Sequence, residues 1–143
     1  METNEAKAEA EDLINAVLPV AQQMLEKYGE FIPYGGAMKP NGEVVSVPGY
    51  DGNEQPSSQE IINLLKDSFR AAGKNGEYKA TAIVFDVHVI APGSDEKTDA
   101  VAVALDHKEG YSVVVLFPYQ LSDGAVEFGQ VFAEAGDNDI FVH

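Results

Sequence analysis

Residues 80–90, 100–105 and 111–117 read ATAIVFDVHVI, AVAVAL and YSVVVLF, and these three segments decide the fold. Each is short, mostly apolar and rich in small, β-branched or aromatic residues, which is typical of a buried β-strand. The intervening stretches, APGSDEKTD and DHKEG, contain the glycine that tight turns favour, and the first also contains proline. The three segments therefore predict a meander of antiparallel strands.

The KEG loop at 108–110 also predicts the register of the last two strands, because a three-residue hairpin loop places its glycine in the left-handed conformation. Val103 then lies opposite Val115, and Ala102 lies opposite Leu116. Side chains alternate at period two, so this register gives the hairpin one bulky face and one alanine-rich face. In the preceding strand the odd-numbered positions are the bulky ones, and we expect that side to carry the helices.

Two amphipathic helices are predicted outside the meander. Apolar residues recur at three- and four-residue spacing over 13–28, although Pro19 lies inside this segment and is expected to kink or restart the helix. Residues 1–11 are rich in Ala and Glu and are expected to fray. The SSQE sequence at 57–60 has the capping-box pattern, so a second helix is predicted to start there and to end at Gly73.

The remaining elements complete an α+β domain. Residues 34–38 and 43–47 flank an Asn-Gly turn and predict a hairpin, residues 125–132 predict a further strand, and residues 137–143 form a tail of uncertain structure. The order α-β-β-α-β-β-β predicts a single domain over 1–143, with an antiparallel sheet and two helices packed on one face. In topology alone this order resembles the profilin, roadblock and secretion-chaperone-like folds, and the resemblance assigns no residue.

Composition bears on the function class. The chain has 143 residues, no cysteine, and 24 acidic against 9 basic residues, which give a formal net charge of −15. The lack of cysteine removes disulfides, Cys-ligated zinc and thiol catalysis, and it favours a cytoplasmic location. The charge repels phosphate backbones and anionic lipids, and no apolar run approaches about 18 residues, so neither nucleic acid nor a membrane is an expected partner. Solubility accounts for the charge, and attraction to a basic protein partner is the alternative.

Asp86 and His88 are the first candidate site. Both project from the thinner face of the strand at 80–90, at a spacing where a carboxylate can orient an imidazole or share a metal ion. The alternative is that both side chains simply face solvent. Asp106 and His107, the nearest further ligands, are expected at the opposite end of the adjoining strand, so no metal site is predicted.

Tyr34, Gly35, Gly36 and Tyr50 are the second candidate site. Glycine lets a ligand approach the main chain, and tyrosine offers contact area and one hydroxyl. The alternative is a bulged hairpin packed by its own tyrosines. The sequence lacks a phosphate-binding loop, a nucleophile elbow and a zinc helix, and the calcium-loop pattern that begins at DGNEQP breaks at its proline.

No catalytic residue, metal or cofactor is predicted. The favoured hypothesis is a non-enzymatic acidic protein-binding module: an adaptor, a chaperone, or a toxin-neutralising protein of the bacterial immunity type, the last by association with size and acidity. The alternative is a small-ligand-binding or enzymatic domain that uses the Asp86/His88 face or the Tyr34/Tyr50 region. Both faces of the hairpin are apolar while two helices suffice for one face, so a homodimer packed alanine face to alanine face is also predicted.

Overall fold

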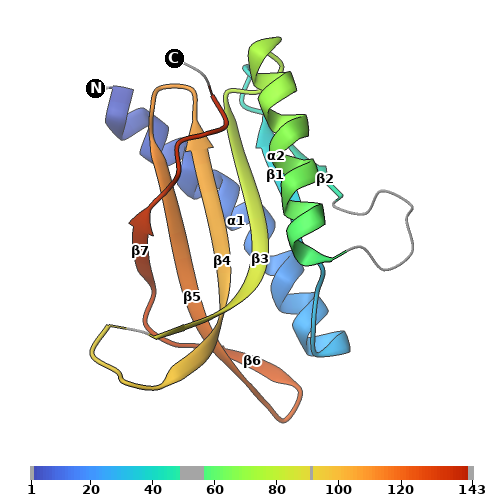
Figure 1. The fold of residues 1–143 in the computed structure, drawn as a ribbon, viewed down its shortest axis with the longest axis vertical. Coiled ribbons are helices and arrows are strands. Elements are labelled where there is room, and N and C mark those ends of the chain that lie inside the picture. Colours follow the sequence, from blue (N-terminus) through green and yellow to red (C-terminus); the bar gives the residue numbers. More distant parts are fainter. Residues whose placement is uncertain (1, 49–56, 91, 142–143) are drawn as a thin grey trace.

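The computed structural model describes residues 2–48, 57–90 and 92–141. In chain order its elements are α1 (Glu2–Tyr28), β1 (Tyr34–Met38), β2 (Val44–Val47), α2 (Ser58–Lys74), β3 (Ala80–Ile90), β4 (Lys97–His107), β5 (Ser112–Ser122), β6 (Ala125–Phe128) and β7 (Phe132–Ala135). The strand pairs are antiparallel and the helices lie outside the sheet, so the fold is α+β, as predicted (Figure 1).

The sheet has the strand order β2-β1-β3-β4-β5-β6, and β7 also pairs with β5. The predicted register of the β4–β5 hairpin is confirmed, with Val103 opposite Val115 and Ala102 opposite Leu116. Gly110 has a φ of +92° in the loop between these strands, a conformation that favours glycine. The β1–β2 hairpin joins the meander along the free edge of β3, through pairing of β1 with β3.

Residues 125–132, predicted as one strand, instead contribute to two short strands. β6 pairs with the half of β5 that starts at Tyr119, and β7 pairs with the half that ends at Leu116. Pro118 lies between these halves and has no N–H to donate along this edge, although its carbonyl accepts a hydrogen bond from the Gly129 N–H at 2.7 Å. The interrupted ladder separates the two strands.

α1 packs on the sheet face formed by the even residues of β3 and the odd residues of β4. Leu13 and Val17 belong to the same buried cluster as Val84 and Val103. The helix continues through Pro19, whose side chain is exposed, so the expected restart is not found. It also begins at Glu2, so residues 2–11, which we expected to fray, are helical.

α2 packs on the opposite face, which corrects the expectation that both helices share one face. Its residues Ile61, Leu65 and Phe69 are buried with Ile83 of β3. Neighbouring residues of a strand point to opposite sides, so Ile83 lies under α2 while Val84 lies under α1. Both faces of β3 are therefore packed, and not the odd-numbered face alone.

After β7 the chain crosses back to α2, where residues 139–141 lie. Ile140 and Phe141 are buried against α2, and the Asp139 carboxylate binds the Lys66 ammonium at 3.1 Å and the Arg70 guanidinium at 2.9 Å. Ile140 and Phe141 therefore belong to the core, whereas Asp137 and Asn138 are exposed. Within the described residues, no helix is long and apolar enough to cross a membrane.

Candidate functional site

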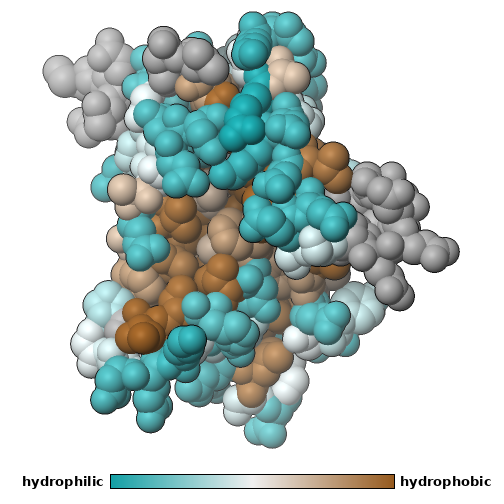
Figure 2. Space-filling view, viewed as in Figure 1, coloured by the Kyte–Doolittle hydropathy of each residue, from teal (hydrophilic) through white to brown (hydrophobic). Residues whose placement is uncertain are grey.

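The face that carries α2 is covered over only part of its width. α2 packs on β1 and β3, and toward β5 and β7 a separate apolar cluster remains beside it. This cluster has a buried floor of Ala100, Ala102 and Leu116. Its outer members are partly buried, and we call them the open patch: Phe85, Val87, Val89, Val114 and Phe132. Figure 2 shows hydrophobic side chains gathered over this part of the sheet, between α2 and β7.

The open patch does not have the pattern of a sheet face that meets water. Such a face normally carries polar side chains at alternate positions, whereas this side of β4 presents Ala100, Ala102 and Ala104. Contiguous apolar surfaces on a folded protein frequently mark the sites where other molecules bind. The open patch is therefore the first candidate for a functional surface.

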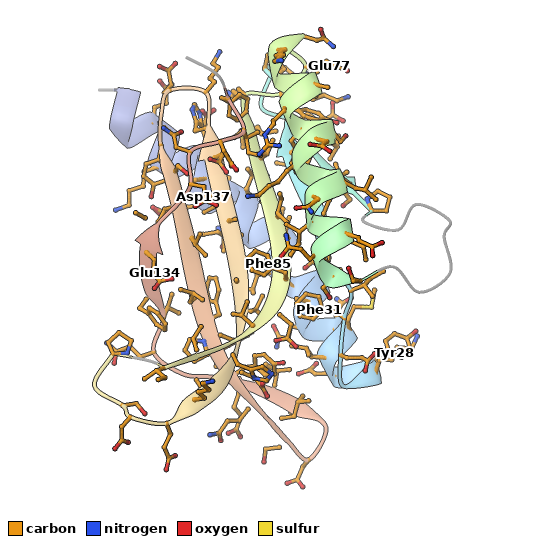
Figure 3. All side chains as sticks on the ribbon, in the orientation of Figure 1. Tyr28, Phe31, Glu77, Phe85, Glu134 and Asp137 are labelled. Atoms are coloured by element: carbon orange, nitrogen blue, oxygen red, sulfur yellow. The ribbon has the colours of Figure 1, made fainter. Side chains whose placement is uncertain are left out.

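Acidic groups border the open patch along β7 and the segment that follows it. Glu134 of β7 is paired with Val114 of β5, so its side chain lies on the same face as the patch. Figure 3 shows Phe85 on β3, with Glu134 on β7 and Asp137 beyond the end of β7. Lys66 of α2 reaches this border, where its ammonium is bound by Asp137 at 3.4 Å as well as by Asp139.

A cleft of about 240 Å³ continues the open patch toward the end of the sheet where the chain returns to α2. It shares Phe85 and Val114 with the patch, and we call it the Asp106 cleft. Its other lining residues come from α2, three strands and the C-terminal segment: Gln59, Ile62, Lys66, Ile83, Ala104, Leu105, Asp106, Ser112, Val113, Gly136, Asp137 and Asp139.

The charged groups of the Asp106 cleft differ in how well neighbouring charges compensate them. Burial raises the pKa of Asp106, and the nearby carboxylates of Asp139 and Asp137 also raise it. The hydrogen bond from Ser112 and the charge of Lys66 act in the opposite direction, but the net shift is upward. Burial opposes the charges of Lys66 and Asp139, but their ion pair outweighs it, so the pKa of Lys66 is raised and that of Asp139 is lowered. Asp106 is therefore the member of the group whose charge is least well compensated.

Asp86 and His88, the first predicted site, lie on the opposite face of the sheet and have different partners. The Tyr119 hydroxyl donates to both Asp86 carboxylate oxygens, at 3.1 and 3.2 Å, whereas His88 Nδ1 lies 2.7 Å from Asp99 Oδ1. Burial raises the pKa of Asp86 and Asp99 adds to the shift, while burial followed by the charge of Asp86 raises the pKa of Tyr119. The His88 side chain is 75% exposed.

The described residues contain no group of three or more His, Asp or Glu side chains placed to hold a metal ion. Asp86 and His88 each make a contact to a different strand, Asp86 to Tyr119 of β5 and His88 to Asp99 of β4.

Side chains of the two helices fill the space beside Gly35 and Gly36, which belong to the second predicted site. A Cβ atom at Gly35 would lie 2.8 Å from Phe69 Cζ of α2, and one at Gly36 would lie 2.5 Å from Val17 Cγ1 of α1. The glycines thus let two helices approach β1 closely from opposite faces. The Tyr34 hydroxyl donates to the Val17 carbonyl at 2.5 Å, and burial raises the pKa of Tyr34. Tyr50 lies outside the described residues.

An apolar groove of about 300 Å³ lies beside Tyr34, between α1 and the β1–β2 hairpin. Its wall includes Val20, Phe31 and Val47, together with Met24, which is 40% exposed. The groove could take a small apolar group, which keeps the small-ligand alternative tied to the Tyr34 region.

Sequence reasoning predicted that the helices would leave the alanine side of β4 uncovered, but it placed both helices on the other face, whereas α2 covers part of the alanine side. It missed the Asp106 cleft. Asp106 was considered only as a distant metal ligand, because its neighbours Asp137 and Asp139 belong to a segment that is remote in sequence. No protein-family model, curated protein or solved structure matches the chain.

Proposed function

We propose that the protein is a non-enzymatic, acidic binding module whose open patch docks a partner protein with apolar and basic side chains. The observation that carries this proposal is the apolar surface around Phe85 and Val114, which leads into a cleft that contains a buried carboxylate. Apolar burial would supply most of the affinity. An adaptor, a chaperone and a toxin-neutralising protein all need such a surface.

Charge complementarity favours a basic partner. The chain carries a net charge of −15, and Glu134 and Asp137 lie at the border of the open patch. A field of this sign accelerates the approach of a positively charged protein and repels an acidic one. Lys66 reduces the local charge only in part, because its ammonium already binds two carboxylates.

A second copy of the chain is the other candidate occupant, because the open patch lies on the alanine side of β4, where a homodimer interface was predicted. Two copies would bring together two chains of charge −15, with the Glu134 side chains beside the same interface. Like charges at an interface weaken association. A basic partner therefore fits the surface better than a second copy does.

The small-ligand or enzymatic alternative has weaker support. Asp86 and His88 bind separate partners at the surface, and Gly35 and Gly36 pack against helices. The apolar groove beside Tyr34 remains the one observation that favours a small ligand in this region.

A peptide titration tests the proposed function. We would add a synthetic peptide of alternating Leu and Lys to the ¹⁵N-labelled chain and follow the amide resonances, with a Leu and Glu peptide for comparison. Saturable shifts at residues of the open patch are expected with the Leu and Lys peptide, and none are expected with the Leu and Glu peptide. The double variant Val87→Ser, Val114→Ser should bind at least about tenfold more weakly, because each change places a hydroxyl in the apolar contact.

Ile90→Ser is the matched control, because Ile90 lies on the same strand, points to the opposite face and is 55% exposed. Equal binding by the double variant and the unchanged chain would refute the proposal. Light scattering should give the monomer mass of 15.4 kDa. A dimer that the double variant converts to monomer would instead identify a second copy as the occupant.

A further inference from the structure

The Asp106 carboxylate is buried, yet it uses only part of its hydrogen-bonding capacity. Asp106 is 9% exposed, and its Oδ1 accepts a hydrogen bond from the Ser112 hydroxyl at 2.8 Å. Ser112 Oγ in turn accepts from the Asn138 N–H at 3.0 Å, which orients the hydroxyl toward Asp106. Among the described residues Oδ2 has no hydrogen-bond donor, and Asp106 lines the cleft. A carboxylate held in this way can accept two more hydrogen bonds from a group that enters the cleft.

The basic residues around the Asp106 cleft are already committed to other carboxylates. Lys66 binds Asp137 and Asp139, and Arg70 binds Asp139 and, at 3.2 Å, Asp67. No described residue forms an ion pair with Asp106. The charge of Lys66 offsets the burial of Asp106 only in part, since the pKa of Asp106 stays raised, and an entering cation would offset it further.

The rest of the cleft suits an aliphatic chain. Its floor includes Ile83, Phe85 and Ala104, which are apolar, and it opens onto the open patch through Phe85 and Val114. The C-terminal segment forms one wall, and it approaches β5 closely because Gly136 has no side chain: a Cβ atom there would clash with Ser112 Oγ. A volume of about 240 Å³ lies just below the range of drug-sized pockets and suits a single side chain.

We propose that the Asp106 cleft receives an arginine side chain of the docked partner, with the guanidinium on Asp106 and the aliphatic stem on Phe85. This inference rests on the proposed function, because the same partner would cover the open patch. The arginine would enter from the patch, through the residues that the two surfaces share. It would anchor the basic partner at the acidic end of the interface.

The chemistry of the cleft favours a guanidinium over other cations. A metal ion needs several ligands around one point, and the described residues offer no such group. A planar guanidinium presents its N–H groups as a fork, so it can bind Asp106 and still reach the exposed carboxylate of Asp137. It is also less strongly hydrated than an ammonium, which lowers the cost of entry into a partly apolar cleft.

A titration with n-butylguanidinium tests this assignment without a known partner. The full ¹⁵N-labelled chain would be titrated at constant ionic strength with n-butylguanidinium, n-butylammonium and the neutral analogue n-butylurea. Saturable shifts at the amides of Asp106, Ser112 and Asn138 are expected with n-butylguanidinium. n-Butylammonium should bind at least about threefold more weakly, and n-butylurea should not reach saturation.

Asp106→Asn should weaken binding of n-butylguanidinium at least about tenfold, since the amide keeps the hydrogen bond from Ser112 and loses the charge. Asp12→Asn removes one charge from an exposed position on α1 and should leave binding unchanged. No saturation with n-butylguanidinium, or equal binding by Asp106→Asn and the unchanged chain, would overturn the inference. If the Leu and Lys peptide still bound the open patch in that case, the proposed function would stand; loss of both would refute both.

Discussion

The two faces of the sheet differ in the direction in which a helix crosses them. α1 has 27 residues and runs diagonally behind the sheet, where it packs on β1, β2, β3, β4 and β6 (Figure 1). α2 has 17 residues and lies along β3, where it packs on β1 and β3. A helix about 10 Å wide that follows strands about 4.8 Å apart covers roughly two of them, whereas a diagonal helix crosses the sheet. The direction of α2 is therefore what leaves part of its face open.

The side chains of β4 match this difference. Val101, Val103 and Leu105 point toward α1 and belong to its buried cluster. Ala100 and Ala102 point to the other side and form the floor of the open patch. Large side chains fill the space under the helix, and small ones keep the open face shallow, so that a partner can approach the sheet closely.

The largest expected effect compares a covered leucine with an uncovered one. Leu105→Ala should lower the free energy of unfolding by about 2–5 kcal/mol, because it leaves a cavity under α1. Leu121→Ala, at a residue of β5 that is 44% exposed, should cost less than about 1 kcal/mol. Urea denaturation measures both values. Similar losses would show that the α1 face is no better packed than the surface.

Gly36→Ala tests the close contact between β1 and α1. The added methyl group would lie 2.5 Å from Val17 Cγ1, so the variant should lose about 1–3 kcal/mol through overpacking. Val17→Ala removes the opposing atoms and should reduce the cost of Gly36→Ala when the two changes are combined. A double-mutant cycle measures this coupling. Strict additivity would mean that the glycine serves another purpose.

Ser57→Ala tests the N-terminal cap of α2, the shorter of the two helices and the one that leaves the open patch uncovered. Ser57 Oγ accepts a hydrogen bond from the Glu60 N–H at 3.1 Å, so its loss should cost about 1 kcal/mol. Ser58→Ala, one position later and already within the helix, should be close to neutral because alanine has the higher helix propensity. Equal denaturation midpoints for the two variants would argue against the cap.

The smallest expected effect concerns the start of α1. Glu9 binds Lys79, and His107 Nε2 lies 2.8 Å from Glu9 Oε1; burial opposes the charge of Glu9, but these contacts outweigh it and lower its pKa from 4.5. A lowered pKa in the folded state contributes stability above about pH 4.5, and this contribution is lost as the pH falls through the folded value. Glu9→Gln, which keeps the acceptor oxygen, should cost less than about 1 kcal/mol at neutral pH.

The difference between Glu9→Gln and the unchanged chain should disappear in acid, and denaturation from pH 7 to pH 3 would follow it. Glu11→Gln, at an exposed position two residues later, provides the control. A difference that stays constant with pH would exclude the ion pair as its cause.

Local patterns in the sequence predicted much of the fold. The bounds of β3 and β1, the register of the β4–β5 hairpin and the cap at Ser57 follow from period-two alternation, turn chemistry and capping. Less of the candidate site could be predicted from the sequence. The alanines of the open patch were visible on one side of β4, and the predicted β4–β5 register already pairs Asp106 with Ser112. Asp137 joins them only when the C-terminal segment crosses β5.

The sequence by itself determined that residues 80–117 form a meander with apolar side chains on both sides, because alternation and turns act over a few residues. The tertiary structure decided which helix covers which side, that α2 lies along β3, and that Asp106 forms no ion pair with another described residue. These outcomes depend on packing between segments far apart in the chain, such as Val17 against Gly36 and Phe69 against Gly35. A periodic pattern shows that a face must be covered, but the covering element is selected by shape and distance in the folded molecule.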